Sequence, residues 1–242
     1  MAYNPTPNLA FSYTARTTTY TAVANNFVDC TSGTFTVTLP TAVGVSGQTI
    51  TVLNSGSGVI TLNTTSSQTI FVGSALASGV IKMGKPGDKV ILVSNGTNWL
   101  AAEFDVHVGA RADTSTTTVT GTVATMIFTN VVSGDNPQGD YSTGTGLYTC
   151  SIPGLYQAAG AIYADVTSAA DDLVQTYIYK NAGVAVEWVQ RMSGDRSNIS
   201  FPISGRVRLA AGDTASLRFN MAGTSPSHTS SRDYFEITRI GN

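Results

Sequence analysis

The sequence predicts an all-β protein made of two β-sandwich domains, and three observations lead to this prediction. Apolar and polar residues alternate along most of the chain, whereas the spacing of an amphipathic helix is almost absent. The 242 residues include 24 glycines and many threonines and serines, which suit tight turns and pleated strands. Short strand-like runs are separated by Gly, Pro, Asn and Ser clusters, which is typical of sandwiches and jelly rolls.

The charge balance excludes some partners. Charged residues make up 12% of the chain, where soluble domains have about 25%. Thirteen basic and fifteen acidic residues give a net charge of -2, so we expect no nucleic-acid partner, which would require concentrated positive charge. No apolar stretch approaches the ~20 residues that span a bilayer, so we expect no membrane insertion. The N-terminus lacks the pattern of a signal peptide, which predicts a protein made in a cytoplasm and not exported by itself.

The first part of the chain predicts an arm and then a β-sandwich module. Residues 1–15 contain two prolines and predict an extended N-terminal arm without a core of its own. The module is expected over residues 16–104. In Thr34–Leu39, Phe and Val and Leu alternate with threonine, which predicts a half-buried strand. Similar runs follow at Thr49–Leu53, Val59–Leu62, Thr69–Val72, Lys89–Val93 and Asn98–Ala102.

Two further features concern buried residues of the chain. Asn95-Gly96 between the last two runs predicts a tight turn and a hairpin, with Trp99 entering the core as the chain returns. Cys30 and Cys150 lie far apart in strand-like runs, and one pair cannot build a disulfide framework. We therefore expect both cysteines to be buried thiols that behave as small hydrophobic residues.

The second domain is expected over residues 116–242, after a charged linker at 105–115 that precedes a threonine run. Its predicted strands are short and numerous. They are Val123–Phe128, Leu147–Ile152, Tyr156–Val166, Leu173–Lys180, Val184–Val189, Ile199–Ile203, Val207–Leu209, Ala215–Phe219 and Tyr234–Ile240.

Two of these strands are apolar on both faces. Tyr156–Val166 and Leu173–Lys180 carry aromatic, aliphatic or small side chains at odd and even positions alike. Such a strand must be covered twice, once by its own sandwich and once by something else. A second chain would supply that cover. A purely intramolecular cover is the alternative, because monomers tolerate some exposed apolar surface.

An ordered set of motifs in the second domain carries a family resemblance. The motifs are Gly139–Tyr156, Val174–Gly183, Val207–Leu217 and Asp233–Ile240. Together they closely resemble the globular head of complement component one-q and the related tumour-necrosis-factor-like jelly rolls, over about residues 125–242. The chain departs from the eukaryotic members because it lacks a collagen stalk. The resemblance implies a C-terminal jelly roll and a homotrimer, with tyrosines near the three-fold axis. The candidate interface residues are Tyr156, Tyr163, Tyr177 and Tyr179.

The first domain resembles a small β module common in phage tail fibres. Its signature comprises Val37–Pro40, Gly47–Gly58 and Val93–Trp99, and the resemblance covers about residues 16–103. A fibre module joined to a trimeric jelly roll implies a bacteriophage structural protein on the virion surface, made in the cytoplasm of the host bacterium.

Two functions remain open for such a protein. The first is a short tail fibre or receptor-binding knob whose loops contact a host surface glycan or protein; the candidate receptor residues are Asp135, Asp140, Asp171, Asp172 and Arg232. The second is a capsid decoration (cement) trimer that stabilises the phage head. In either case the partners are further copies of the chain and other virion proteins of the capsid or tail.

Catalytic signatures are lacking, so we expect no enzyme. The two histidines, His107 and His228, lie in the linker and in a loop, and no nucleophile elbow is present. A glycan depolymerase, the third hypothesis, needs two carboxylates ~5–10 Å apart in a groove. Asp171 and Asp172 are adjacent and point to opposite sides of an extended chain. We expect no cofactor; calcium bound by loop oxygens is the one ion left open.

Overall fold

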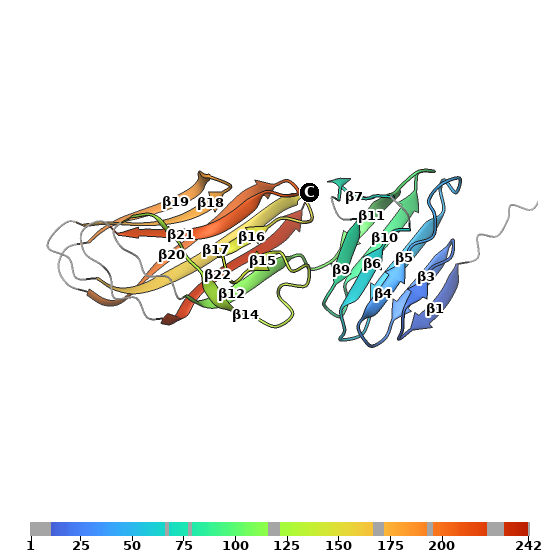
Figure 1. Cartoon of the computed structure of the whole chain (residues 1–242), viewed down its shortest axis with the longest axis horizontal. Helices are drawn as coiled ribbons and strands as arrows, with labels where there is room; N and C mark the ends of the chain where they lie inside the picture. The colour runs from blue at the N-terminus through green and yellow to red at the C-terminus, as the bar shows by residue number, and fades with distance from the viewer. Residues whose placement is uncertain are drawn as a thin grey trace, which may run out of the picture. The chain divides into compact units, whose positions relative to one another are not determined.

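The computed structural model describes residues 11–65, 68–76, 79–115, 122–166, 172–192, 196–221 and 230–241. Every regular element in these ranges is a β-strand, which confirms the predicted all-β class. The chain divides into two compact units, Met1–His107 and Val108–Asn242, called here the N-terminal and C-terminal units (Figure 1). The described residues contain no helix with the length and hydropathy needed to cross a membrane.

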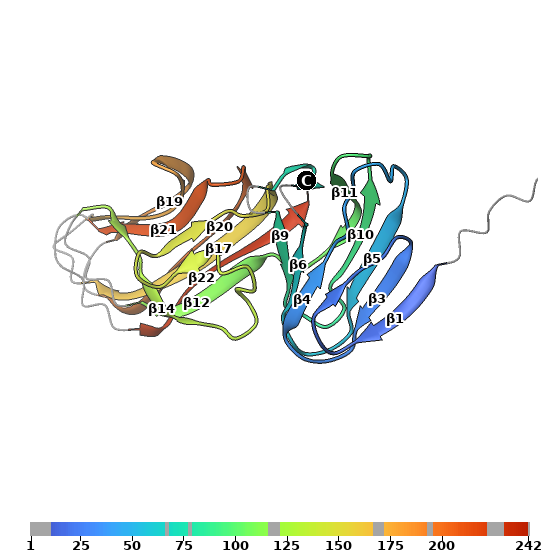
Figure 2. The same cartoon turned by 45° about the vertical axis from the view of Figure 1, so that its right-hand side comes forward.

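The N-terminal unit consists of two sheets, as a sandwich requires. Sheet A has the strand order β1 (Ser12–Arg16), β3 (Asn26–Cys30), β5 (Thr49–Asn54), β10 (Lys89–Ser94), β11 (Trp99–Asp105), β7 (Ile70–Val72), β8 (Ser74–Ala75). Sheet B has the order β2 (Tyr20–Thr21), β4 (Phe35–Thr38), β6 (Ile60–Asn63), β9 (Val80–Met83). Figure 2 shows β1, β3, β5 and β10 side by side, and β4, β6 and β9 in a second row.

The first six strands form parallel coils. The chain alternates between the sheets from β1 to β6, and neighbours within each sheet run parallel: β1 with β3, β3 with β5, β2 with β4, and β4 with β6. Each coil therefore gives one strand to each sheet. The later strands β9 and β10 then add in the antiparallel sense to β6 and β5. Alternating hydrophobicity indicates which side chains point inward but not which way a strand runs, so the sequence did not predict the coils.

The first coil closes the N-terminal end of the core with polar side chains. Asn26 is fully buried, and its Nδ2 donates to the Ser12 carbonyl oxygen at 2.6 Å and to Thr14 Oγ1 at 3.0 Å. Its Oδ1 accepts from the Tyr20 hydroxyl at 3.0 Å. The Arg16 guanidinium lies 3.9 Å from the centroid of the Tyr20 ring. A polar terminal coil is what a stack of coils needs where its apolar core meets water.

The first coil shows that the prediction of an extended arm over residues 1–15 was wrong for its last residues. Ser12–Arg16 form β1, which pairs with β3 along its whole length. The sequence did not indicate this strand, because its inward-facing residues are Ser12, Thr14 and Arg16 and it therefore has no apolar inner face. Residues 1–10 lie outside the described residues.

The predicted hairpin of the N-terminal unit is confirmed. β10 and β11 pair in the antiparallel sense, and Trp99 is fully buried with its Nε1 donating to the Pro40 carbonyl oxygen at 3.1 Å. The turn has four residues, Asn95–Asn98, with Gly96 at a φ of 91°. The Asn95 side chain accepts the backbone N–H groups of Thr97 and Asn98, which holds the turn from inside.

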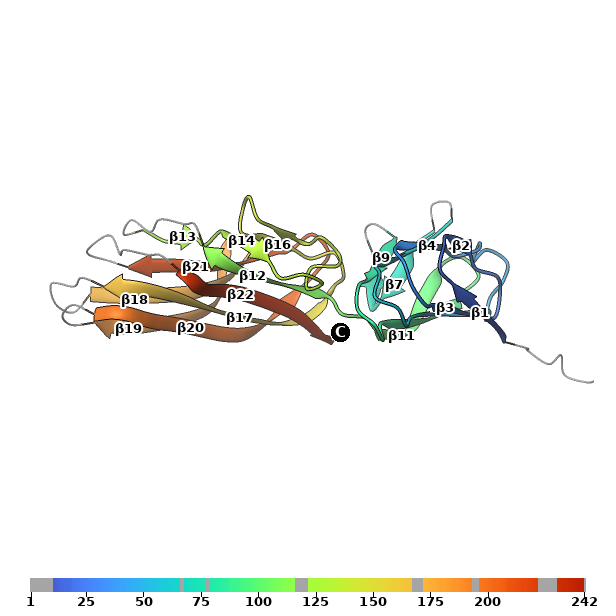
Figure 3. The same cartoon turned by 90° about the horizontal axis from the view of Figure 1, so that it is seen from below.

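The C-terminal unit is a jelly roll of two antiparallel sheets. Sheet C has the order β14 (Phe128–Val131), β12 (Gly109–Ser115), β22 (Ser230–Gly241), β17 (Gly154–Val166), β20 (Arg196–Leu209). Sheet D has the order β15 (Tyr141–Ser142), β16 (Leu147–Thr149), β21 (Thr214–Met221), β18 (Asp172–Lys180), β19 (Gly183–Met192), and β13 (Ala124–Thr125) pairs with β21. The chain crosses between the sheets at every connection except β15 to β16 and β18 to β19. Figure 3 shows β12, β22, β17 and β20 following one another across sheet C.

The structure moves the boundary between the units. Most of the predicted linker, residues 105–115, is the strand β12, and the division falls between His107 and Val108. Ala110 and Ala112 are buried on either side of the exposed Arg111 of β12. The linker prediction was wrong because small inward-facing alanines give a weak apolar signal beside charged neighbours. The predicted strands 199–203 and 207–209 are parts of the single strand β20.

Candidate assembly and attachment surface

Tyr156 belongs to the core of its own protomer. Its side chain is fully buried between the sheets, its hydroxyl donates to the Ile152 carbonyl oxygen, and its ring lies 5.7 Å from that of Tyr148. Burial raises the pKa of Tyr156 well above its usual range, and it raises the pKa of the neighbouring Cys150 thiol to about 11. The prediction that Tyr156 lies at a subunit interface is wrong, because β17 turns this face inward.

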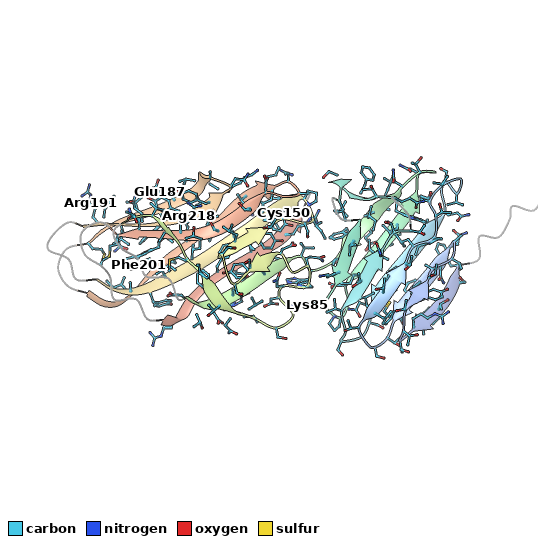
Figure 4. The ribbon with its side chains drawn as sticks, viewed as in Figure 1. Lys85, Cys150, Glu187, Arg191, Phe201 and Arg218 are labelled. Atoms are coloured by element: carbon cyan, nitrogen blue, oxygen red, sulfur yellow. The ribbon has the colours of Figure 1, made fainter. Side chains whose placement is uncertain are left out.

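Tyr177 and Tyr179 lie on the outer face of sheet D, where side chains of the same protomer bury them in part. The two rings meet edge to face at 5.7 Å, and the Arg218 guanidinium lies 3.9 Å from the centre of the Tyr179 ring. Tyr177 is only 7% exposed, and burial, with the carboxylate of Glu187 nearby, raises its pKa. Figure 4 shows Glu187 and Arg218 on strands of this sheet. The intramolecular alternative thus accounts for most of the Tyr177 cover, whereas Tyr179 stays half-exposed.

Tyr163 and Arg232, predicted for different roles, lie together. Tyr163 is half-buried on β17, and its backbone N–H donates to Asp233 Oδ1 at 2.7 Å. The Arg232 guanidinium lies 6.0 Å from the centre of the Tyr163 ring, and Arg232 is exposed. Both face outward near the end of the jelly roll where β17 ends and β18 begins. This pair is therefore placed where a contact with another molecule can form.

The predicted receptor acids divide between the two ends of the jelly roll. Asp140 is half-buried, and its Oδ2 accepts from the Ser151 hydroxyl at 2.8 Å, so it holds the chain near β16. Asp135 is half-buried in the same loop before β15. Asp172 begins β18 at the opposite end, and Asp171 lies outside the described residues. Among the described residues, Asp135 and Asp140 lie at one end of the jelly roll and the start of β18 at Asp172 lies at the other, so these three acids do not form one site.

An ion-paired turn lies at the end of the jelly roll near β16. Asp213 accepts from Asn181 Nδ2 at 2.9 Å and from Lys180 Nζ at 2.8 Å, and the Ala210 N–H also donates to it. The hydrogen bond from Asn181, with those from Lys180 and Ala210, lowers the pKa of Asp213 to about 2. These contacts tie the turn after β20 to the β18–β19 turn.

The most exposed apolar strand of the jelly roll is one whose importance the sequence did not indicate. β19 is a ten-residue strand at the edge of sheet D, and Val184 and Val189 on it are 51% and 48% exposed. Its inner side packs across the sandwich: a Cβ built on Gly205 of β20 would lie 2.4 Å from Val186 Cγ2. The exposed valines, spaced by five residues around a bulge opposite Ile178 and Tyr179, give no simple alternation. Only the pairing order reveals that the strand is an edge.

Groups that could hold a metal or perform acid–base chemistry are scattered. Among the described residues, no group of three or more His, Cys, Asp or Glu side chains could hold a metal ion. The backbone N–H of His107 donates to Asp88 Oδ1 at 2.9 Å, and burial raises the pKa of Asp88. His228 lies outside the described residues.

Comparisons with known proteins each cover part of the chain. The chain matches no protein-family model. It is 35% identical over 96 residues to a subunit of the complement C1q subcomponent of Rattus norvegicus, a match that covers 38% of this chain and 36% of the relative. The chain thus spans about a third of the length of that curated relative. Similar solved structures include murine APRIL, with a TM-score of 0.44, 10% identity, and coverage of 55% of this chain and 99% of that one. A TNF named Eiger from S. frugiperda has a TM-score of 0.44, 13% identity, and coverage of 56% and 94%.

Proposed function

We propose that this chain is a non-enzymatic, self-associating protein of a bacteriophage virion surface. Its C-terminal jelly roll forms a trimer, and the trimer acts as a short tail fibre or receptor-binding knob. The support for the jelly roll is the strand order of sheets C and D, and the 35% identity to a protein named as one subunit of complement C1q agrees with it. The support for a virion is the fibre-type signature of the N-terminal unit.

The observation that carries self-association is the exposed edge strand β19. Long edge strands with exposed apolar side chains are hazards that proteins normally shorten, charge or cover. β19 carries the exposed charges Glu187 and Arg191, and it still exposes apolar side chains. β19 has ten residues, and Val184 and Val189 on it are about half exposed. A neighbouring protomer that covers this edge removes the hazard. Three copies related by a closed rotation can cover all three edges at once.

The outer face of sheet C is suited to receive that edge. Along β17 it carries the small side chains Ala159 and Ala161, of which Ala161 is buried and pairs across the strands with Pro202 of β20. Tyr163 and Tyr234 stand at one end of this face. Small side chains allow close approach of another chain, and the tyrosines supply contact area with little loss of conformational entropy.

Self-association is tested by light scattering of the purified full chain. We expect three times the single-chain mass of 25.2 kDa. Val189→Glu places a charge on the β19 edge and should shift the protein toward single subunits. Val43→Glu is the matched control, because Val43 is 59% exposed in a loop of the N-terminal unit, and this variant should stay associated. A wild-type protein that is monomeric at all concentrations would refute the trimer.

The virion location is tested by counting copies per particle. A few trimers at the tail support attachment, and purified protein should then bind host cells. Hundreds of copies spread over the head would instead support the decoration alternative, and particles lacking the protein should then still adsorb but break on heating. Absence from purified particles would refute both.

A further inference from the structure

The two outer faces of the N-terminal unit differ in chemistry. The outward residues of sheet B are mostly polar: Thr21, Thr36, Thr38, Thr61, Asn63, Val80 and Lys82. The outward residues of sheet A include six large apolar or aromatic side chains, defined here as the sheet A patch: Tyr13, Phe27, Leu53, Ile91, Val93 and Leu100. Threonine side chains make the outer face of sheet B hydrophilic. The coil architecture itself therefore does not require an apolar outer face.

The patch is continuous across four strands. The register places Tyr13 beside Phe27, Phe27 beside Thr51, and Thr51 beside Ile91. Thr51 faces outward between two of these large side chains and yet is only 6% exposed. Tyr13 is 66% exposed, and its ring lies 5.8 Å from that of Phe27. Leu100 is also exposed, and the other four side chains of the patch are half-buried. Contiguous apolar surface is typical of an interaction site, whereas scattered single residues are not.

The charged side chains that border the patch are compensated by their neighbours. Asp29 accepts hydrogen bonds from the Tyr13 hydroxyl at 2.8 Å and from the Ser55 hydroxyl. Lys89 pairs with Glu103 at 2.6 Å. The face therefore offers an apolar centre whose border holds the carboxylates Asp29 and Glu103 and the single cation Lys89, which disfavours a polyanion as the partner.

We propose that the sheet A patch packs against the sheet A patches of other copies of this chain. This inference rests on the proposed self-association of the C-terminal unit. Residues 106–108 alone separate β11 from β12, so association of the C-terminal units holds the N-terminal units close together. A short tether gives an effective concentration on the order of millimolar, at which even a modest apolar contact forms. The second contact extends the interface between copies along the N-terminal unit.

Distances between copies test the proposal in the full chain. Spin labels are attached at Leu100→Cys, on the rim of the patch, or at Thr61→Cys, on the outer face of sheet B; the native cysteines are buried. Pulsed dipolar spectroscopy then measures the distance between labels on different protomers. Stacked sheets lie ~10 Å apart, so we expect the distance between labels at position 100 to be roughly 10–20 Å shorter than that between labels at position 61.

A substitution within the patch completes the test. Ile91→Glu should lengthen and broaden the distances between labels at position 100, whereas Thr36→Glu on sheet B should leave them unchanged. Equal distances at the two positions, or a shorter distance at position 61, would overturn the proposal. The sheet A patch would then be covered by another protein or exposed to water. Light scattering separates the two failures. If the copies associate and the distances disagree, only this inference falls, but if the protein is monomeric, the proposed trimer falls with it.

Discussion

Replacing Gly205 should reveal how tightly the edge strand β19 is held against the rest of the jelly roll. Gly205 lies on the inner side of β20, and an added Cβ would lie 2.4 Å from Val186 Cγ2 and 3.1 Å from Val186 Cγ1. Real Cβ atoms do not approach other heavy atoms as closely as the shorter distance, so Val186 and β19 must shift. Such overpacking typically costs ~1–3 kcal/mol.

The second residue of the pair predicts a rescue. Val186→Ala alone removes two half-buried methyl groups and should cost about 1 kcal/mol. In Gly205→Ala with Val186→Ala the two clashing methyl groups are gone and the remaining contact is with the Cβ of residue 186 at 3.3 Å. The double variant should therefore be more stable than the sum of the single effects by about 1–2 kcal/mol. Gly183→Ala on the same strand is the control, because the nearest atom to its Cβ would be 3.8 Å away, and it should change little.

Calorimetry at one fixed protein concentration measures these effects through the melting of the C-terminal unit. A loss of 1 kcal/mol lowers the melting temperature of a domain of this size by roughly 4 °C. If the two single effects add in the double variant, or if Gly205→Ala is neutral, β19 does not pack on β20 as described. The close approach of the two strands would then be wrong.

Three further predictions concern the polar first coil of the N-terminal unit, the ion-paired turn at Asp213 and the two buried thiols. Asn26→Ala leaves several hydrogen-bonding groups of the first coil unsatisfied and should lower the free energy of unfolding by ~1–3 kcal/mol. Hydrogen exchange measures this as faster exchange of the β1 amides, and an unchanged rate would contradict the role of Asn26. The folded-state pKa of Asp213 is lowered to about 2, so its stabilisation is present above about pH 4 and is lost as the pH falls toward 2. Asp213→Asn should therefore flatten the decrease of melting temperature between pH 4 and 2, and a slope equal to that of the wild type would refute the link. Burial raises the pKa of Cys30 to about 12 and of Cys150 to about 11; neither should react with a thiol reagent at pH 8 until the chain unfolds, and rapid labelling of the native protein would show that a thiol is accessible.

The positions of most strands could be predicted from the sequence, because alternation and turn residues report burial directly. The predicted runs 49–53 and 173–180 correspond to β5 and β18 almost residue for residue. Strand direction and pairing order could not be predicted, since parallel and antiparallel strands share one alternation. For this reason the coils of the N-terminal unit were not foreseen.

The candidate interface shows the same limit at the level of single residues. Both faces of β17 carry apolar side chains, and the sequence does not tell which face points into the sandwich. Tyr156 points inward and Tyr163 outward, although the two look alike in the pattern. Tyr177 looked uncovered because its cover comes from Arg218 and Glu187, whose positions depend on pairing across three strands.

The parallel coils also determine how the N-terminal unit can change in length. Asn26 pairs with Ile50, so the winding from β3 to β5 takes 24 residues. A duplicated segment of that length, inserted before β5, would continue both ladders and leave the polar first winding and the closing antiparallel strands untouched. Each insertion would extend the unit by ~4.8 Å, the spacing of neighbouring strands. Evolution or an engineer can thus set the reach of this unit in whole steps without redesigning either end.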